Sequence, residues 1–156
     1  MGIIAKKIKS WGIELGFNQV GISDVNLNHA KKSYFEWLAA GFQGEMDYLD
    51  KHKEFKFKPD SLVPNTVRII SVKLDYLPNR DNPEKILQDK NKAYISRYAL
   101  GRDYHKVVRG KLKKLVNKMQ SELIELNISC RVFSDSAPVL EVELAEKSGL
   151  GWRGKH

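Results

Sequence analysis

An aspartate lies between two serines in the stretch FSDSAPVLE, Phe133–Glu141. It follows the apolar run ISCRVF and precedes Pro138, so we expect Asp135 at the junction of a strand and a helix. Side chains at such junctions lie beside unpaired helix amides, where many α/β proteins bind ligands. Asp135 is therefore either an acid that faces a ligand or a cap of the following helix.

A group of basic residues lies between Asp103 and Met119. It has six members: Lys106, Arg109, Lys111, Lys113, Lys114 and Lys118. Phosphate recognition requires point charges of this kind at roughly phosphate spacing, without sequence specificity. We take Arg109, Lys113 and Lys114 as candidate phosphate contacts. A solvated helix face opposite an apolar stripe would have the same composition.

The end of the chain, GLGWRGKH at 149–156, combines three glycines with an aromatic residue and basic residues. Glycine allows a backbone to approach a bulky or phosphorylated ligand closely. We therefore treat Gly154, Lys155 and His156 as candidate ligand contacts. An ordinary turn would have the same glycine spacing, so the pattern by itself is not specific.

Composition limits the classes of protein that the chain can belong to. Its 156 residues, 42% of them hydrophobic, suffice for the core of one domain, and its formal charge of +8 favours polyanionic partners such as nucleic acid. It has no apolar run of membrane-spanning length and no signal-peptide core, so we expect a cytoplasmic protein without a membrane partner. The single Cys130 excludes an internal disulfide, and metal-site spacing is absent among the histidines: His29, His52, His105 and His156.

Periodicity predicts the elements that must position these residues. A helical repeat predicts helices over residues 3–17, 31–40, 104–127 and from Pro138 to about Ser148, the last with Ser136 as N-cap and Gly149 after its end. A two-residue repeat predicts strands over residues 67–77 and 128–133. Together these elements indicate an α/β (α+β) fold in which a central mixed β-sheet is flanked by helices.

Five blocks of the sequence resemble one family. They are GEMDYL (44–49), LVPNTVRIISVKLDYLP (62–78), ISRYALGRDYHKVVRGKLKKL (95–115), DSAPVLE (135–141) and LAEKSGLGWRGKH (144–156). In this order they closely resemble epoxyqueuosine reductase, the cobalamin-dependent family that completes queuosine in tRNA anticodons. The resemblance covers nearly the whole chain.

The resemblance implies that residues 1–156 form a cobalamin-binding domain of the reductive-dehalogenase type. In the family, two 4Fe–4S clusters lie in a ferredoxin-like module that follows this domain, and a single cysteine cannot hold such a cluster. We therefore expect the chain to be the N-terminal part of the enzyme, which by itself does not turn over epoxyqueuosine with a physiological electron donor. We also expect it to be a monomer. The implied partners are an external electron donor and tRNA with a GUN anticodon that carries epoxyqueuosine.

The resemblance also implies roles for individual residues. Asp135 is implied to donate the proton to the epoxide oxygen, in preference to acting as a helix cap. Val142 stands where the family has an arginine that contacts tRNA, so either another cation substitutes for it or tRNA binding is weaker. Contacts to cobalamin are implied for Lys58, Arg97, Tyr98, Tyr104, His105, Ser136, Gly154, Lys155 and His156.

Two other functions compete with this one. A noncatalytic basic RNA-binding module would require only the basic stretch at 104–119. A cobalamin-dependent, dehalogenase-like reductase of a small molecule would share the fold, although the formal charge of +8 argues against it. Cobalamin binding would distinguish the RNA-binding module from the two reductases. Competition by tRNA would distinguish epoxyqueuosine reductase from a dehalogenase-like reductase of a small molecule.

Overall fold

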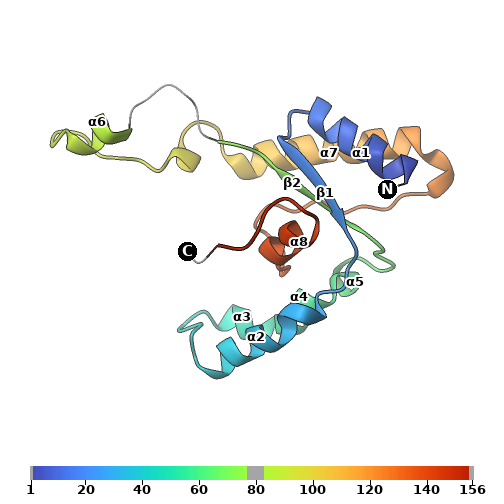
Figure 1. Ribbon diagram of the computed structural model, residues 1–156, viewed down its shortest axis with the longest axis horizontal. Helices are drawn as coiled ribbons and strands as arrows, with labels where there is room; N and C mark the ends of the chain where they lie inside the picture. The colour runs from blue at the N-terminus through green and yellow to red at the C-terminus, as the bar shows by residue number, and fades with distance from the viewer. Residues whose placement is uncertain (1, 77–82, 155–156) are drawn as a thin grey trace.

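The structure, a computed structural model, describes residues 2–76 and 83–154. Its sheet consists of two antiparallel strands, β1 (Gln19–Ser23) and β2 (Ile69–Lys73), which lie near the centre of the molecule (Figure 1). The expected α+β class, with helices around a central sheet, is confirmed. The sheet is smaller than expected and, within the described residues, is this antiparallel pair alone.

The helices expected from periodicity are present: α1 (Ile3–Glu14), α2 (Asn28–Ala39), α7 (Tyr104–Glu122) and α8 (Glu141–Lys147). Gly149 follows α8 with a φ of 79°, a left-handed conformation that glycine adopts without steric cost. Helix α8 begins at Glu141, later than the expected start near Pro138.

Two apolar cores hold these helices on the strands. In the first core, side chains of α1 and α7 interlock, and every one of them is at least nine-tenths buried: Ile8, Trp11, Leu115 and Met119. In the second, α8 packs against α2 and the segment before β2 through Leu27, Ala30, Phe57 and Leu144. The strands lie between the two cores, since Ile70 of β2 contacts the first and Ile69 contacts the second.

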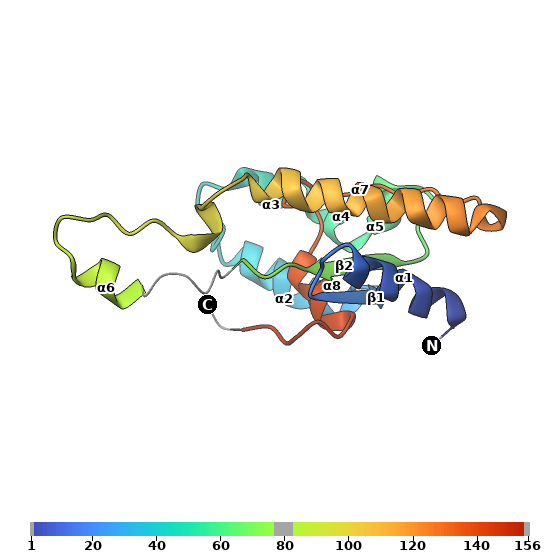
Figure 2. The ribbon, with the colours of Figure 1, turned by 90° about the horizontal axis from the view of Figure 1, so that it is seen from above.

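Shorter elements join these parts and were not predicted. They are α3 (Asp47–Lys51), α4 (Lys53–Phe57), α5 (Pro59–Leu62), α6 (Pro83–Gln88) and two 3₁₀ turns, η1 (Arg97–Ala99) and η2 (Ile124–Leu126). Helix α6 lies away from the rest of the molecule in both views (Figures 1 and 2). Helix α7 runs from the base of this extension along the body of the molecule, so its N-terminal end faces the extension (Figure 2).

The prediction of a strand over residues 128–133 was wrong. These residues form no ladder with a neighbouring strand in the described part of the chain. Ile128 packs against the first core, and its carbonyl accepts a hydrogen bond from Gln120 Nε2 at 3.0 Å. Its neighbours Cys130 and Arg131 are exposed. The segment therefore meets the first core through Ile128, and the alternation of its residues does not correspond to a paired strand.

A close approach between β1 and the end of α8 depends on Gly21. A Cβ atom at this position would lie 2.6 Å from Cβ of Ser148 and 2.8 Å from its backbone oxygen. Side-chain carbons do not pack at such distances, so any larger residue at position 21 would displace α8. The strand thus fixes the position of the helix that follows the Asp135 loop.

Candidate active site

Asp135 lies in the loop between α7 and α8 and is exposed. Its backbone has a φ of 53°, in the left-handed region that aspartate and asparagine tolerate better than most residues. Such conformations are concentrated at functional sites, because the surrounding fold must offset their cost. The N-cap of α8 is Leu140, without a side-chain cap bond, so the expectation that Ser136 caps this helix was wrong.

The start of α7 brings two further side chains to Asp135. The Tyr104 hydroxyl donates a hydrogen bond to Oδ2 of Asp135, and His105 Nε2 lies 3.6 Å from the same oxygen. The hydrogen bond to Asp135 raises the pKa of Tyr104 to about 12, so this phenol remains protonated as a donor. The ring of Tyr98 meets the Tyr104 ring edge-on at 6.2 Å. Three residues implied by the resemblance therefore form one cluster with Asp135.

Glu141 is the neighbour of Asp135 that the sequence analysis did not identify as a site residue. Loss of water around its carboxyl group raises the pKa of Glu141 above its ordinary value of 4.5, although the residue as a whole is exposed. The negative charge of Asp135 and a hydrogen bond shared with its side chain raise this pKa further. The two carboxyl groups therefore act as a pair that retains a proton more readily than an isolated glutamate does.

This pair gives the stability of the chain a testable dependence on pH. A carboxyl group with a raised pKa in the folded state binds its proton more tightly there, so the free energy of unfolding falls as the pH rises above 4.5. We expect Glu141→Gln to make the free energy of unfolding fall less between pH 4.5 and neutral pH than it does in the unsubstituted chain. Urea unfolding at the two pH values measures this difference. Glu146→Gln, on an exposed residue of the same helix, is the control and should change nothing. Identical pH dependences for both variants would contradict the pairing.

The other expected cofactor contacts are more scattered. Arg97 is half-buried and precedes the exposed Tyr98 in η1, and Ser136 is exposed beside Asp135. Lys58 is exposed between α4 and α5, and no hydrogen bond or ion pair joins it to this cluster within residues 2–76 and 83–154. Gly154 is exposed. Lys155 and His156 lie outside the described residues.

The six basic side chains of α7 divide into two groups. Lys111 donates hydrogen bonds to the backbone oxygens of Leu15 and Gly16 at 2.9 and 3.1 Å, and Lys118 pairs with Glu14 at 2.7 Å. These two lysines hold the end of α1. The remaining four are exposed, and no ion pair engages them in the described part of the chain: Lys106, Arg109, Lys113 and Lys114.

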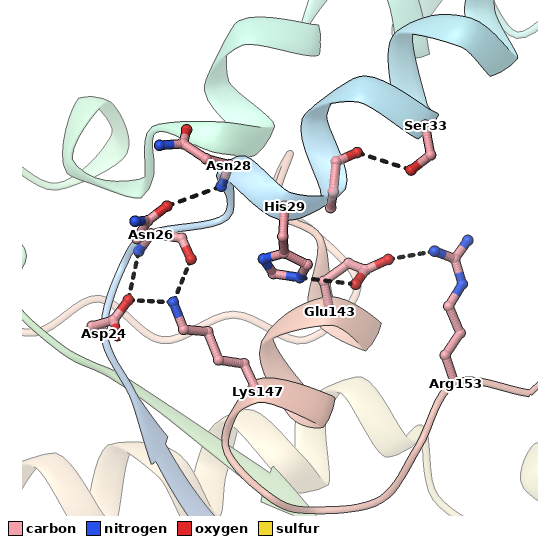
Figure 3. A network of polar contacts seen from close by, with 9 residues as sticks. Asp24, Asn26, Asn28, His29, Ser33, Glu143, Lys147 and Arg153 are labelled. Atoms are coloured by element: carbon pink, nitrogen blue, oxygen red, sulfur yellow. Dashed lines mark hydrogen bonds and ion pairs between the residues drawn. The ribbon is translucent and has the colours of Figure 1, made fainter.

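A polar network joins α8 to α2 and to the C-terminal segment (Figure 3). Its centre is Glu143, whose side chain is only 10% exposed. One carboxylate oxygen lies 3.5 Å from His29 Nε2, and the other accepts a hydrogen bond from Arg153 Nη1. Arg153 thereby attaches the glycine-rich segment to α8. Glu143 was not a candidate site residue from the sequence, whereas Arg153 lies in the glycine-rich segment that was.

The other end of α8 is attached to the loop between β1 and α2. Lys147 donates from Nζ to Asp24 Oδ1 and to the backbone oxygen of Asn26 (Figure 3). The Asp24 carboxylate also accepts a hydrogen bond from the backbone N–H of Asn26 at 2.8 Å. The hydrogen bond from Lys147 lowers the pKa of Asp24. Helix α8 is thus held at both ends, which fixes Glu141 beside the Asp135 loop.

Comparison with known proteins identifies the family. The model described as epoxyqueuosine reductase QueG, DUF1730, matches residues 56–136, more than half of the 156-residue chain. The chain belongs to the epoxyqueuosine reductase QueG family. The matched region of this QueG chain includes Tyr98, Tyr104, His105 and Asp135, the residues that the structure brings together.

Curated QueG relatives share about half of their residues with this chain. The epoxyqueuosine reductase of Aliivibrio fischeri is 51% identical over 153 residues, and that of Escherichia coli is 48% identical. Each alignment covers 98% of this chain, but only 41% and 40% of the respective relative. The chain thus spans about two-fifths of the length of the curated relatives it matches.

Solved structures confirm the fold. An epoxyqueuosine reductase from Streptococcus thermophilus superposes with a TM-score of 0.76 at 22% identity, over 97% of this chain and 40% of that one. An epoxyqueuosine reductase crystallised with an epoxyqueuosine-modified stem loop of tRNA-Tyr gives a TM-score of 0.72 at 21% identity, over 96% and 39% of the two chains. At these identities the match establishes the QueG fold alone. In the described residues, no helix is long and apolar enough to cross a membrane.

Proposed function

We propose that this chain acts in the reduction of epoxyqueuosine to queuosine in tRNA, as the part of the enzyme that binds the modified nucleotide and protonates the departing oxygen. The observation that carries the proposal is the position of Asp135, exposed and hydrogen-bonded by Tyr104 beside a second carboxyl group. Membership of the QueG family supports it. Such a substrate also places the protein in the cytoplasm.

The reaction defines what the residues must do. The epoxide takes up two electrons and two protons, both C–O bonds break, the oxygen leaves as water and an alkene remains. Negative charge develops on the oxygen as each C–O bond breaks, so an acid within hydrogen-bond reach lowers the barrier. Asp135 is the exposed carboxyl group that Tyr104 and His105 meet, and Glu141 helps the pair to retain a proton. Asp135 is therefore the proposed proton donor.

The exposed surface next to Asp135 fits the large flat cofactor that the family implies. Tyr98 is 56% exposed, and several of its neighbours in residues 94–100 also expose apolar surface, which favours contact with a ring system. No group of three metal-binding side chains lies in the described residues, and a corrin does not need one because its ring nitrogens bind the cobalt. Tyr98, Arg97 and Ser136 would hold cobalamin. When bound, it would supply a strongly reducing cobalt, with electrons from an external donor and two 4Fe–4S clusters outside this single-cysteine chain.

The exposed basic side chains of α7 are the proposed contact with tRNA. Lys106, Arg109 and Lys113 follow one another at three- and four-residue spacing, so they share the face opposite the buried Leu115. The helix rises about 1.5 Å per residue, which places Lys113 roughly 12 Å along the helix from His105. Phosphates that flank a nucleotide at Asp135 would lie over this stripe. Val142 at the start of α8 is 58% exposed but uncharged, so it cannot contact a phosphate as the arginine of the family would.

Reversal of two charges tests this contact. We expect Lys113→Glu combined with Lys114→Glu to weaken binding of a tRNA anticodon stem loop several-fold and to reduce the slope of log affinity against log salt by about one unit per lost phosphate contact. Fluorescence anisotropy at several salt concentrations measures both quantities. The matched control is Lys6→Glu with Lys7→Glu, the same charge change on exposed residues of α1. Equal effects of the two double variants would mean that net charge alone governs binding.

Conversion of the substrate tests the proposed function directly. The cobalamin-loaded chain is mixed with a stem loop that contains epoxyqueuosine and with a chemical reductant, and queuosine is measured by mass spectrometry of the nucleosides. Formation of queuosine is the expected result. Tight RNA binding without cobalamin binding would instead indicate a noncatalytic RNA-binding module. Reduction of small halogenated compounds without competition by tRNA would indicate a dehalogenase-like reductase.

A further inference from the structure

The imidazole ring of His105 is held in a defined orientation. Its Nδ1 atom lies 2.9 Å from Oδ1 of Asp103, the same oxygen that accepts the backbone N–H of His105 as the N-cap of α7. The hydrogen bond from His105 lowers the pKa of Asp103, so this carboxylate is ionised and only accepts. Nδ1 must therefore carry a hydrogen atom. Nε2 is left as the ring nitrogen that gains and loses a proton.

The neighbours of His105 direct Nε2 towards Asp135. The Tyr104 ring stacks on the imidazole with centroids 4.0 Å apart, and Nε2 lies 3.6 Å from Asp135 Oδ2. On the backbone side, Arg109 Nε donates to the carbonyl of His105 at 3.2 Å. The His105 side chain is still 40% exposed, so the ring contacts both solvent and Asp135. Imidazole is also the side chain best suited to exchange protons near neutral pH.

The stoichiometry of the proposed reaction requires such a group. Removal of the epoxide oxygen as water consumes two protons, whereas a single carboxyl group donates one. Asp135 must therefore regain a proton in every reaction cycle. Tyr104 cannot provide it, because a phenol with a pKa of about 12 does not release its proton at neutral pH. Glu141 shares a hydrogen bond with Asp135 and belongs to the same acid pair, so it too must be reprotonated after it has donated. His105, whose side chain is 40% exposed and whose Nε2 lies 3.6 Å from Oδ2 of Asp135, is the described group beside this pair that can carry a proton in from solvent.

We propose that His105 returns a proton to Asp135, with Asp103 as the positioning residue; the inference rests on the proposed function. The Nε2–H bond of the imidazolium breaks, and its proton passes to Oδ2 of Asp135. The ring becomes neutral and keeps its Nδ1–H bond to Asp103, and water or a buffer acid then reprotonates Nε2. The distance of 3.6 Å exceeds a hydrogen bond, so a small ring rotation or one water molecule must close it.

Charged and titratable groups lie near the His105 ring on every element packed around it. On its own helix these are Asp103, Tyr104, Lys106 and Arg109, on η1 Tyr98 lies behind Tyr104, and the α7–α8 loop and α8 supply Asp135 and Glu141. Two carboxyl groups, Asp103 and Asp135, lie within ion-pair range of the ring nitrogens.

The first test observes the ring itself. In nitrogen-15 spectra of the labelled chain, we expect neutral His105 to carry its proton on Nδ1. Asp103→Ser keeps a residue that caps helices well but removes the ring acceptor, and should shift most of the population to the Nε2–H form. His52 is the internal reference and should not change. An Nε2–H ring in the unsubstituted chain, or a ring unaffected by Asp103→Ser, would overturn the proposal.

The second test uses the cobalamin-loaded chain. We expect His105→Gln to slow epoxyqueuosine reduction by roughly 10²-fold, and added imidazole to restore the rate in proportion to its concentration. The unsubstituted chain should not respond to imidazole. A slow variant that imidazole does not rescue would make His105 a structural residue, and an undiminished rate would also overturn the proposal. If the unsubstituted chain does not reduce the substrate, the proposed function fails first and the proton-supply role fails with it, whatever the ring spectra show.

Discussion

Asp135→Asn is expected to slow the reduction of epoxyqueuosine by about 10² to 10⁴-fold, the usual consequence of losing a general acid. The amide has the size of the carboxyl group and still accepts the hydrogen bond from Tyr104, but it has no acidic proton to donate. Asparagine also tolerates the left-handed φ of 53° at this position. The loop should therefore keep its shape, so that the loss of rate reports on the proton alone.

Single-turnover conversion with chemically reduced cobalamin is the measurement, because it does not depend on electron delivery. Cobalamin affinity and thermal unfolding of the variant are expected to remain close to those of the unsubstituted chain. Asp47→Asn, the same chemical change on an exposed residue of α3, is the control and should react at the full rate. An undiminished rate for Asp135→Asn would assign the proton to another group, of which Glu141 is the nearest.

Leu115→Ala is expected to lower the free energy of unfolding by about 2 to 5 kcal/mol. The Leu115 side chain is 2% exposed and packs among Ile8, Trp11 and Met119, so its removal leaves a cavity between α1 and α7. Helix α7 carries Tyr104 and His105 at its first turn, so a loosened helix also disturbs the contacts to Asp135. Activity should therefore fall more steeply with temperature than in the unsubstituted chain.

Urea unfolding followed by far-ultraviolet circular dichroism measures this loss. Leu87→Ala is the matched control, because Leu87 in α6 is 65% exposed and its truncation leaves no cavity. We expect that control to change the free energy of unfolding by less than about 0.5 kcal/mol. Similar losses for the two variants would contradict the view that the α1–α7 core holds the fold together.

Helices with a continuous apolar stripe were predictable from the sequence, and so was strand β2, which lies within the strand predicted over residues 67–77, whereas β1 was not predicted. The apolar stripe of α7 is long enough to indicate a helix without an alternative, and the structure packs this stripe against α1. Strand β1 has five residues, one of them Gly21, so its alternation is too short to distinguish from a loop. Residues 128–133 alternate equally well but find no partner strand within the described residues. Pairing between strands depends on distant segments, which local periodicity does not contain.

The candidate site was predictable only in part, because contacts between residues far apart in the sequence are not visible in local patterns. Asp135 and the Tyr104–His105 block were identified by family resemblance, but their contact spans about thirty residues of chain and required the structure. Glu141 was missed because a glutamate at a helix start normally serves the helix dipole. The basic stretch was overcounted, since Lys111 and Lys118 bind α1. At about 100° per residue, Lys111 and Lys118 lie beside the apolar stripe of the helix, so their spacing already indicated that they face a neighbouring element and not solvent.

Helix α8 has seven residues and carries two carboxylates of different use, Glu141 beside Asp135 and Glu143 against His29 and Arg153. So short a helix has no room to bend between them. A displacement of the C-terminal segment that moved Glu143 through Arg153 would therefore also move Glu141, which lies two residues earlier in the same helix. Leu144 in the second core and the ion pair between Lys147 and Asp24 oppose such a displacement, so the acid pair keeps its geometry when that segment moves.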